Sequence, residues 1–176
     1  MMVTLKKEKL QHISSGCIEV TKIKMPKMNE REIKSLISEQ FLCRIAFRGE
    51  AQPYVAPFQY VVVDGTLYFH FTDYGKKMNF FKQGTPVCVE IERYTPNLSE
   101  YEFVVLSGNL KMVENHEERK KAIMKMAEVG KQQLSPIFLV AHGFTKGSDW
   151  DEFTYDQPIL IIKLDNVREK TGLKSP

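Results

Sequence analysis

The sequence predicts a mainly β domain, an antiparallel barrel with small helical covers. Three observations indicate this fold. Six segments have the composition or period-two alternation of strands, Asp64-Gly65 is a strong hairpin turn, and only three short helical segments interrupt the strands. With 176 residues the chain has room for one such domain.

A capping box predicts the first helix. Asn29 is followed three residues later by Glu32, so that each side chain can bond the backbone N–H of the other. Apolar residues then recur at helical spacing on one face: Ile33, Leu36 and Ile37. We therefore expect a short amphipathic helix over Glu30–Gln40.

After this helix the period changes from that of a helix to that of a strand. The predicted strands are 41–48, 54–63, 66–72, 87–92, 101–110 and 158–164. The second strand contains Pro57, which has no N–H to donate to a sheet ladder. We expect Pro57 at a bulge, or at an edge where something other than a neighbouring strand lies alongside.

Two further helices and several less regular segments complete the prediction. A short helix over Lys76–Gln83 turns Met78, Phe80 and Phe81 inward, and Asn115 with Glu118 opens a third helix that ends near Val129. Residues 1–25 are expected to form an arm, 130–157 a long connection and 170–176 a basic tail.

Composition and charge narrow the class of partner. The 25 Lys and Arg residues against 22 Asp and Glu residues give a net charge of +3, without one dominant basic cluster, so no nucleic-acid partner is expected. No apolar run has the length of a membrane span, which indicates a cytoplasmic protein without membrane contact. The dispersed cysteines and histidines predict neither disulfides nor a metal site.

The segment from Tyr68 to Lys77 carries the clearest chemical signal. Lys76 and Lys77 stand in the first turn of a predicted helix, where the helix dipole favours anions and disfavours cations. A doubly cationic first turn therefore indicates that a phosphate binds there. The alternative is that both lysines are simply solvated.

Pro57 adds a second part of the same site. It predicts a stretch from Val55 to Phe58 whose backbone groups lack ladder partners, and a flat ring with amide edges, such as a flavin, could bond to them. His70, Phe71 and Tyr60 would then supply aromatic walls. The alternative for His70 is a histidine packed in the core.

These segments together resemble a known superfamily. The order of the helix, Arg44-Ile45-Ala46, Pro53–Phe58, Asp64–His70, Gly75-Lys76-Lys77, Pro86–Glu90 and Ser107-Gly108 is similar to that of the FMN-binding split β-barrels of the pyridoxamine 5′-phosphate oxidase type. The likeness spans about residues 26–170 and is greatest to the branch of the 5-nitroimidazole reductases. It implies a mainly β (α+β), Greek-key-like antiparallel split barrel.

The resemblance also implies a site and an assembly. It implies a homodimer with FMN at the subunit interface, a small-molecule substrate, and His70 beside the flavin as the catalytic residue. Trp150 and Arg168 are candidates to reach the cofactor across the dimer. The full set of cofactor-binding residues that it implies is Arg44, Val55, Ala56, Pro57, Phe58, His70, Phe71, Gly75, Lys76, Lys77 and Trp150.

The expected function is that of an FMN-dependent oxidoreductase, which passes electrons from a reduced donor to a small acceptor such as a nitro-aromatic. Two alternatives remain open: a non-catalytic flavin store or redox sensor, and a split barrel that binds haem or a deazaflavin. The ending Lys170–Pro176 does not match the segment with which pyridoxamine phosphate oxidases proper bind the substrate phosphate. Oxidation of vitamin B6 is therefore not expected.

Overall fold

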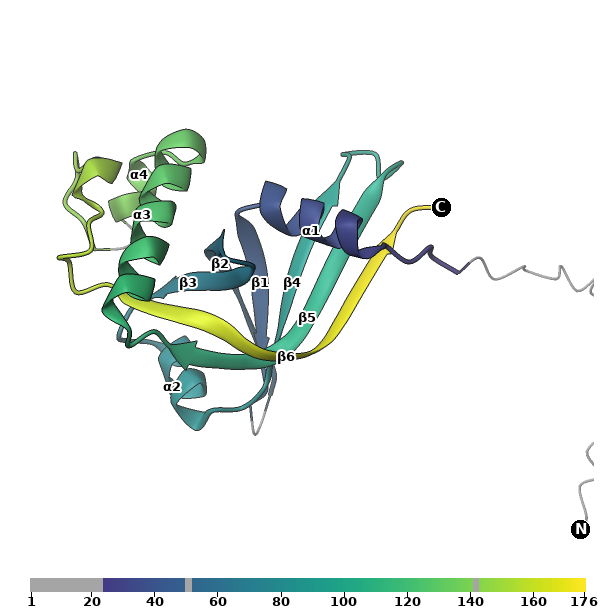
Figure 1. The fold of residues 1–176 in the computed structure, drawn as a ribbon, viewed down its shortest axis with the longest axis horizontal. Helices are drawn as coiled ribbons and strands as arrows, with labels where there is room; N and C mark the ends of the chain where they lie inside the picture. The colour runs from purple at the N-terminus through teal and green to yellow at the C-terminus, as the bar shows by residue number, and fades with distance from the viewer. Residues whose placement is uncertain (1–23, 50–51, 141–142) are drawn as a thin grey trace, which may run out of the picture.

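The computed structural model describes residues 24–49, 52–140 and 143–176. In this part of the chain six antiparallel strands form a closed barrel in the order β1-β2-β3-β6-β5-β4 (Figure 1). The strands are β1 (Leu42–Phe47), β2 (Tyr54–Val63), β3 (Thr66–Phe71), β4 (Val87–Tyr94), β5 (Tyr101–Met112) and β6 (Leu160–Lys174). The predicted barrel is confirmed, whereas the predicted arm 1–25 lies almost wholly outside the described residues.

The helices are α1 (Glu30–Glu39), α2 (Lys76–Gln83), α3 (His116–Gln133) and α4 (Ile137–Val140), with a 3₁₀ turn η1 (Trp150–Glu152). The capping box of α1 is present as predicted. Asn115 caps α3 at the Glu118 N–H, but the Glu118 carboxylate bonds Tyr68 and Lys163 instead of returning to the cap. No helix among the described residues is long and apolar enough to cross a membrane.

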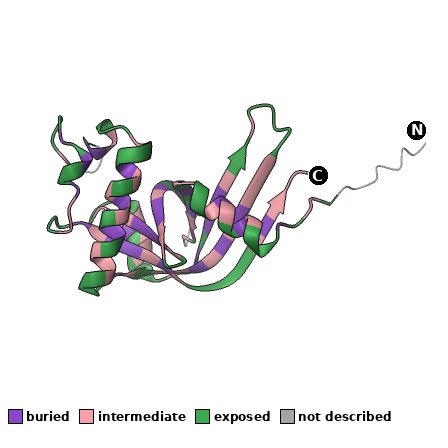
Figure 2. Ribbon diagram, turned by 45° about the horizontal axis from the view of Figure 1, so that its top comes forward, coloured by how far each residue is buried: buried purple, intermediate pink, exposed green. Residues whose placement is uncertain are grey.

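The barrel interior is an apolar core to which every strand contributes alternate residues. On β2 the residues Ala56, Phe58 and Tyr60 point inward, and on β3 Leu67, Phe69 and Phe71 do so. Helix α1 adds Leu36 and Ile33 to this core and lies across the strands at one end of the barrel (Figure 1). Figure 2 shows the buried residues concentrated where the strands face one another and face the helices.

A second apolar cluster lies outside the barrel. It joins α3, α4 and η1 to the outer face of the sheet through Val61, Tyr68 and Ile161, with Trp150 and Leu139 at its centre. In Figure 1 these helical segments form a separate layer beside one end of the strands. The segment predicted as a long connection is therefore partly helical. Together α3, α4 and η1 form a layer outside the barrel, which we call the outer cover.

The last strand is longer than predicted. β6 runs to Lys174, so most of the segment expected as a basic tail is strand that pairs with β5. The pairing ties the two ends of the described chain together, because the Met28 N–H donates to the Gly172 carbonyl (2.9 Å) and the Lys174 N–H to the Pro26 carbonyl (3.0 Å). Lysines in this segment contact α1 as ion-pair partners rather than standing free.

Strand β2 has two halves with different neighbours. From Tyr60 to Val63, here the paired half, it bonds β3 on one edge, whereas Tyr54–Gln59, the open half, pairs only with β1. No strand of the described chain pairs with the other edge of the open half. Pro57 lies in this half and stays in regular register with Arg44, so the edge expected at the proline is present and the bulge is not.

Candidate functional site

A pocket of about 320 Å³ lies over the open half of β2, and we call it the β2 pocket. Strand alternation places Pro57 and Gln59 on the outer face of the barrel, because their neighbours Ala56 and Phe58 point into the core. The pocket is lined by Leu42, Tyr54, Ala56, Pro57, Phe58, Gln59, His70, Thr72, Tyr74, Lys77 and Phe138. It thus collects residues from β1, β2, β3, α2 and α4.

The free edge of β2 supplies backbone groups to this site. The Tyr60 N–H donates toward β1, to the Phe41 carbonyl at 2.9 Å, so alternate residues Val55, Pro57 and Gln59 turn their backbone groups the other way. The proline removes one N–H from that edge and leaves its carbonyl. The edge therefore offers donors and acceptors at strand spacing to a flat ligand that lies alongside it.

Gln59 is the polar side chain of the pocket that most needs a ligand. Its Nε2 is buried and has no hydrogen-bond partner among the described residues. A buried amide donor without a partner costs free energy, on the order of 1–3 kcal/mol, unless a ligand or water accepts from it. The apolar side chains of Leu42 and Phe138 stand nearby in the same pocket, which suits a ring with one polar and one apolar end.

Helix α2 begins at the rim of the pocket. Its N-cap is Gly75, whose φ of +87° places it in a region that favours glycine, and no side chain caps the first-turn N–H groups. Lys77 reaches from this turn into the pocket, with Nζ 6.0 Å from the centre of the Phe58 ring. Partial burial lowers the pKa of Lys77, and no acidic side chain of the described chain pairs with it. A bound anion would relieve that desolvation.

His70 separates the β2 pocket from a second space, here the β3 hollow. This hollow has a volume of about 510 Å³ and shares His70, Thr72 and Tyr74 with the β2 pocket. Its other lining residues are Phe71, Asp73, Gly143, Phe144, Gln157, Pro158, Ile159 and Leu160. The His70 ring meets Phe153 edge-on at 5.9 Å between centres. Since Leu67, Phe69 and Phe71 face the core, His70 lies on the outer face of β3.

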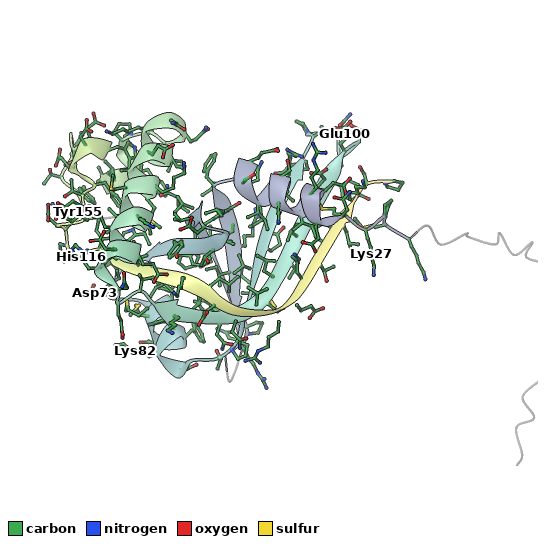
Figure 3. The ribbon with its side chains drawn as sticks, viewed as in Figure 1. Lys27, Asp73, Lys82, Glu100, His116 and Tyr155 are labelled. Carbon is green, nitrogen blue, oxygen red and sulfur yellow. The ribbon has the colours of Figure 1, made fainter. Side chains whose placement is uncertain are left out.

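Arg119 of α3 holds the wall of the β3 hollow. Its guanidinium donates to the carbonyls of Tyr155 (2.7 Å), Gln157 (2.6 Å) and Ile159 (3.2 and 3.1 Å). Figure 3 shows Asp73, another lining residue of the β3 hollow, at the same end of the molecule as Tyr155. The segment between Tyr155 and Ile159 is therefore fixed by a helix that belongs to the outer cover.

The fold and the site agree with one family of proteins. Residues 29–137, more than half of the chain, match the family model described as pyridoxamine 5′-phosphate oxidase. The chain belongs to this family. No curated protein matches the sequence.

Solved structures support the same fold for this pyridoxamine 5′-phosphate oxidase family member. A FAD-binding protein of Mesorhizobium loti has 15% identity and a TM-score of 0.64, with 88% of this chain and all of the other covered. A protein of Bacteroides thetaiotaomicron, named for 5-nitroimidazole antibiotic resistance, has 18% identity and a TM-score of 0.60 over 86% of this chain and 87% of its own. A FAD-binding protein of Mycobacterium smegmatis has 15% identity and a TM-score of 0.56, over 85% and 97%.

Several residues that the family resemblance implied do meet at the β2 pocket. Ala56, Pro57 and Phe58 line it from β2, with His70 from β3 and Lys77 from α2. Gly75 caps α2 beside it, and Lys76 is exposed in the same turn without lining the pocket. The predicted phosphate-binding turn and the predicted free edge of β2 are thus adjacent in this family member.

Other predicted residues lie elsewhere in the described chain. Arg44 donates to Glu90 (3.4 Å) and Glu92 on β4, Arg168 donates to Asn109 (3.0 Å), and Val55 is exposed outside the pocket. Phe71 faces the core and reaches only the β3 hollow. Tyr60, expected as an outer aromatic wall, is instead buried in the barrel, where its hydroxyl donates to the Ile37 carbonyl at 2.8 Å.

Trp150 is buried in the outer cover rather than at the β2 pocket. Its Nε1 donates to the Leu134 carbonyl at 3.3 Å, and its ring stacks on Phe138 with 6.4 Å between centres. Because Phe138 lines the β2 pocket, Trp150 supports the pocket wall from behind. Its place in the structure is that of an anchor for the segment 134–153.

Six lining residues were not predicted: Leu42, Tyr54, Gln59, Thr72, Tyr74 and Phe138. Gln59 had a sequence signal, since it is a polar residue between Phe58 and Tyr60 in a largely apolar strand. Phe138 had none, because its approach to β2 depends on the packing of the outer cover.

Proposed function

We propose that this member of the pyridoxamine 5′-phosphate oxidase family binds FMN in the β2 pocket and serves as a flavin-dependent oxidoreductase. The observation that carries the proposal is the open half of β2. It places an unpaired backbone edge and the unpartnered Gln59 amide next to the Lys77 ammonium. The family match directs the choice among flat anionic ligands toward a flavin.

The residues of the β2 pocket fit FMN in three respects. The isoalloxazine ring carries carbonyl and imide groups along one edge, which complement the Gln59 N–H and the free β2 backbone. Its benzenoid end suits the apolar side chains of Leu42 and Phe138. The phosphate suits the uncapped first turn of α2 with Lys77. The bound flavin would supply hydride and electron transfer.

The chain's own part in the reaction would be binding, orientation and proton handling. Gln59 and the β2 edge would fix the ring, and Lys77 would hold the phosphate. His70 lies on the wall shared by the β2 pocket and the β3 hollow, so an acceptor in that hollow would meet its imidazole. A histidine at that place can hold and release a proton near neutral pH. Small nitro-aromatics, as the nitroimidazole reductase branch suggests, are the acceptors to try first.

We further propose that the protein acts as a homodimer that completes this site. Large apolar side chains stand exposed beside the β2 pocket, on β1, β2, the α2 loop and α4: Leu42, Val55, Tyr74, Ile137 and Val140. Exposed apolar residues that gather in one region favour contact with another protein surface. A second copy seated there would exclude water from the flavin ring.

FAD is the second candidate cofactor. Two structural neighbours are named FAD-binding proteins. The β3 hollow adjoins the β2 pocket through His70, Thr72 and Tyr74, so a longer dinucleotide could extend into it. A non-catalytic flavin store, and a site for haem or a deazaflavin, remain the further alternatives.

Identification of the bound chromophore tests the proposal directly. Purified protein should be yellow and release FMN on denaturation, as mass spectrometry of the extract would show. FAD in the extract would replace FMN, whereas a colourless protein that fails to bind added FMN would refute the flavin site. Reduction of the bound flavin by NADH or NADPH and reoxidation by a nitro-aromatic would separate an enzyme from a store.

A matched pair of lysine variants tests the pocket itself. Lys77→Met should weaken FMN binding by about tenfold or more, because one charge-assisted hydrogen bond to phosphate contributes roughly 1.5–3 kcal/mol. Lys82→Met, in the last turn of the same helix, should leave affinity unchanged. Fluorescence titration with FMN measures both. Equal affinity for all three proteins would place the phosphate elsewhere.

A further inference from the structure

A third hollow lies beside helix α1, and we call it the α1 hollow. It has a volume of about 720 Å³ and lies between α1, the β2–β3 hairpin and the outer parts of β5 and β6. Its apolar lining comes from Ile33, Ile37, Val62, Leu67, Leu106 and Val167. This α1 hollow shares no residue with the β2 pocket or the β3 hollow.

Contacts with β6 and with Tyr60 fix helix α1 at the edge of the hollow. Glu30 and Glu32 pair with Lys170 and Lys174 of β6, and the Tyr60 hydroxyl donates to the Ile37 carbonyl at 2.8 Å. Gly172 lets the helix approach β6 closely, since a Cβ there would lie 2.7 Å from Ile33 Cγ1. With α1 anchored to β6 in this way, the helix is not free to collapse onto the hairpin and fill the space.

The rim of the α1 hollow is cationic. Arg31, Lys34 and Lys170 line it, and none of its lining residues is acidic. Arg31 and Lys34 are three residues apart on α1, on the stripe that continues with Ser35 and Ser38, so both heads stand on one side of the opening. Lys170 is paired with Glu30, whereas neither Arg31 nor Lys34 has an ion-pair partner in the described chain.

We propose that the α1 hollow binds an amphiphilic organic monoanion, with an aliphatic body of medium-chain fatty-acid size and one carboxylate. The apolar floor would take the aliphatic chain, and Arg31 and Lys34 would take the carboxylate. The volume lies within the range of roughly 300–1,000 Å³ that is typical of small-molecule sites. Charge complementarity selects an anion over a neutral lipid, because two unpaired cations and no acid face the opening.

Binding of straight-chain carboxylates to the full chain, with its flavin as purified, tests this inference. Isothermal titration below micelle-forming concentrations should show saturable binding of one dodecanoate per chain. Affinity should rise by about fourfold per added CH₂ from octanoate to dodecanoate, as expected for a chain that enters an apolar site. Absence of saturable dodecanoate binding would overturn the proposal.

Three variants assign the binding to the α1 hollow. Arg31→Gln/Lys34→Gln should weaken dodecanoate about tenfold and leave dodecanol unchanged, whereas Lys111→Gln/Lys146→Gln, two exposed lysines outside the hollow, should change neither. Val167→Trp, at an exposed lining position, should fill the space and abolish binding of both ligands. Flavin content should be the same in all three. Equal weakening by both double variants, or dodecanoate binding that survives Val167→Trp, would contradict the site.

Two other occupants are possible outcomes of the same experiment. If a second copy of the chain fills the hollow, apparent dodecanoate affinity will fall as protein concentration rises and the ligand will dissociate the dimer. If residues 1–23 fill it, deletion of these residues will create dodecanoate binding that the full chain lacks. Either result would overturn a ligand site in the protein as it exists, and neither depends on the flavin proposal.

Discussion

The two halves of β2 differ in nearly every physical respect although they belong to one strand. The paired half, Tyr60–Val63, has β3 on one edge and packs against α3 through Val61 on its outer face. Beside it the Tyr68 hydroxyl and the Lys163 ammonium both donate to Glu118, at 2.8 and 2.7 Å. Within the described chain, the open half, Tyr54–Gln59, has an amide at Gln59 without a hydrogen-bond partner and the Lys77 ammonium nearby without an ion-pair partner. On the edge that continues toward β3, the backbone groups of the paired half bond to a strand, whereas those of the open half are available to a ligand.

The largest effect is expected when a proline is introduced into the paired half, and the matched variant removes the proline of the open half. Val61→Pro removes an N–H that strand alternation points toward β3 and leaves a buried acceptor unpaired, so we expect a loss on the order of 3 kcal/mol or failure to fold. Pro57→Ala, in the open half, should change the free energy of unfolding by no more than about 0.5 kcal/mol. Urea denaturation measures both. Equal costs would mean that the open edge is bonded in solution.

A substitution in α3 of the outer cover should have a smaller effect on stability and should also alter the β2 pocket through Trp150. A Cβ at Gly130 would lie 2.3 Å from Trp150 Cε3, so Gly130→Ala must displace the ring that stacks on Phe138. Overpacking costs about 1–3 kcal/mol, of which the helix preference of alanine returns up to about 1. We expect a lower melting temperature together with weaker FMN binding. Met124→Ala, exposed on the same helix, is the control, and loss of stability without loss of FMN affinity would uncouple Trp150 from the pocket.

The smallest effect should appear in the pH dependence of stability. The Lys163 ammonium and the Tyr68 hydroxyl hold the pKa of Glu118 below its usual range. A carboxyl whose pKa is lower in the folded protein stabilises it above the unfolded pKa, and that contribution is lost as the pH falls through the folded value. Partial exposure of the Glu118 side chain to solvent limits this contribution to about 1 kcal/mol or less. Urea midpoints from pH 7 to pH 3 should fall less steeply for Glu118→Gln than for the unchanged protein.

The same network acts in the opposite direction at alkaline pH. Burial and the Glu118 carboxylate raise the pKa of Tyr68 to about 12. Because the raised value belongs to the folded state, stability is present below the unfolded tyrosine pKa and declines toward pH 12. Absorbance at 295 nm should show a tyrosine that ionises near pH 12, and Tyr68→Phe should remove that step. Persistence of the step in Tyr68→Phe would assign it to another tyrosine, with the buried Tyr60 as the next candidate.

The fold was largely readable from local patterns. The capping box at Asn29, the turn at Asp64-Gly65 and the alternation of β1 to β5 depend on residues close in sequence, and the structure confirms them. The end of β6 was not predicted, because 165–174 are mostly polar and form a strand only through pairing with β5 and the ion pairs to α1. Glu118 likewise does not complete the predicted capping box, because its carboxylate accepts a hydrogen bond from Lys163, 45 residues away.

The residues of the candidate site likewise fall into two groups: those that the local sequence predicts and those that only tertiary packing brings together. Pro57 marked the open edge because a proline can be interpreted without its neighbours, and Lys77 could be placed by the helix start alone. Leu42 of β1 and Phe138 of α4 are far apart in the sequence, so only tertiary packing reveals that they meet at the pocket. Arg44 has the charge expected of a phosphate ligand, yet two carboxylates on β4 compete for its guanidinium.

The strand order has a consequence for folding during translation. β6 is the last of these six strands to be synthesised, but it lies between β3 and β5. Until it emerges, β3 lacks its partner along His70 and Phe71, and the barrel is an open sheet with two exposed edges. Nascent chains should therefore depend on chaperones until the final strand closes the sheet, and a translation pause before β6 would prolong the aggregation-prone stage.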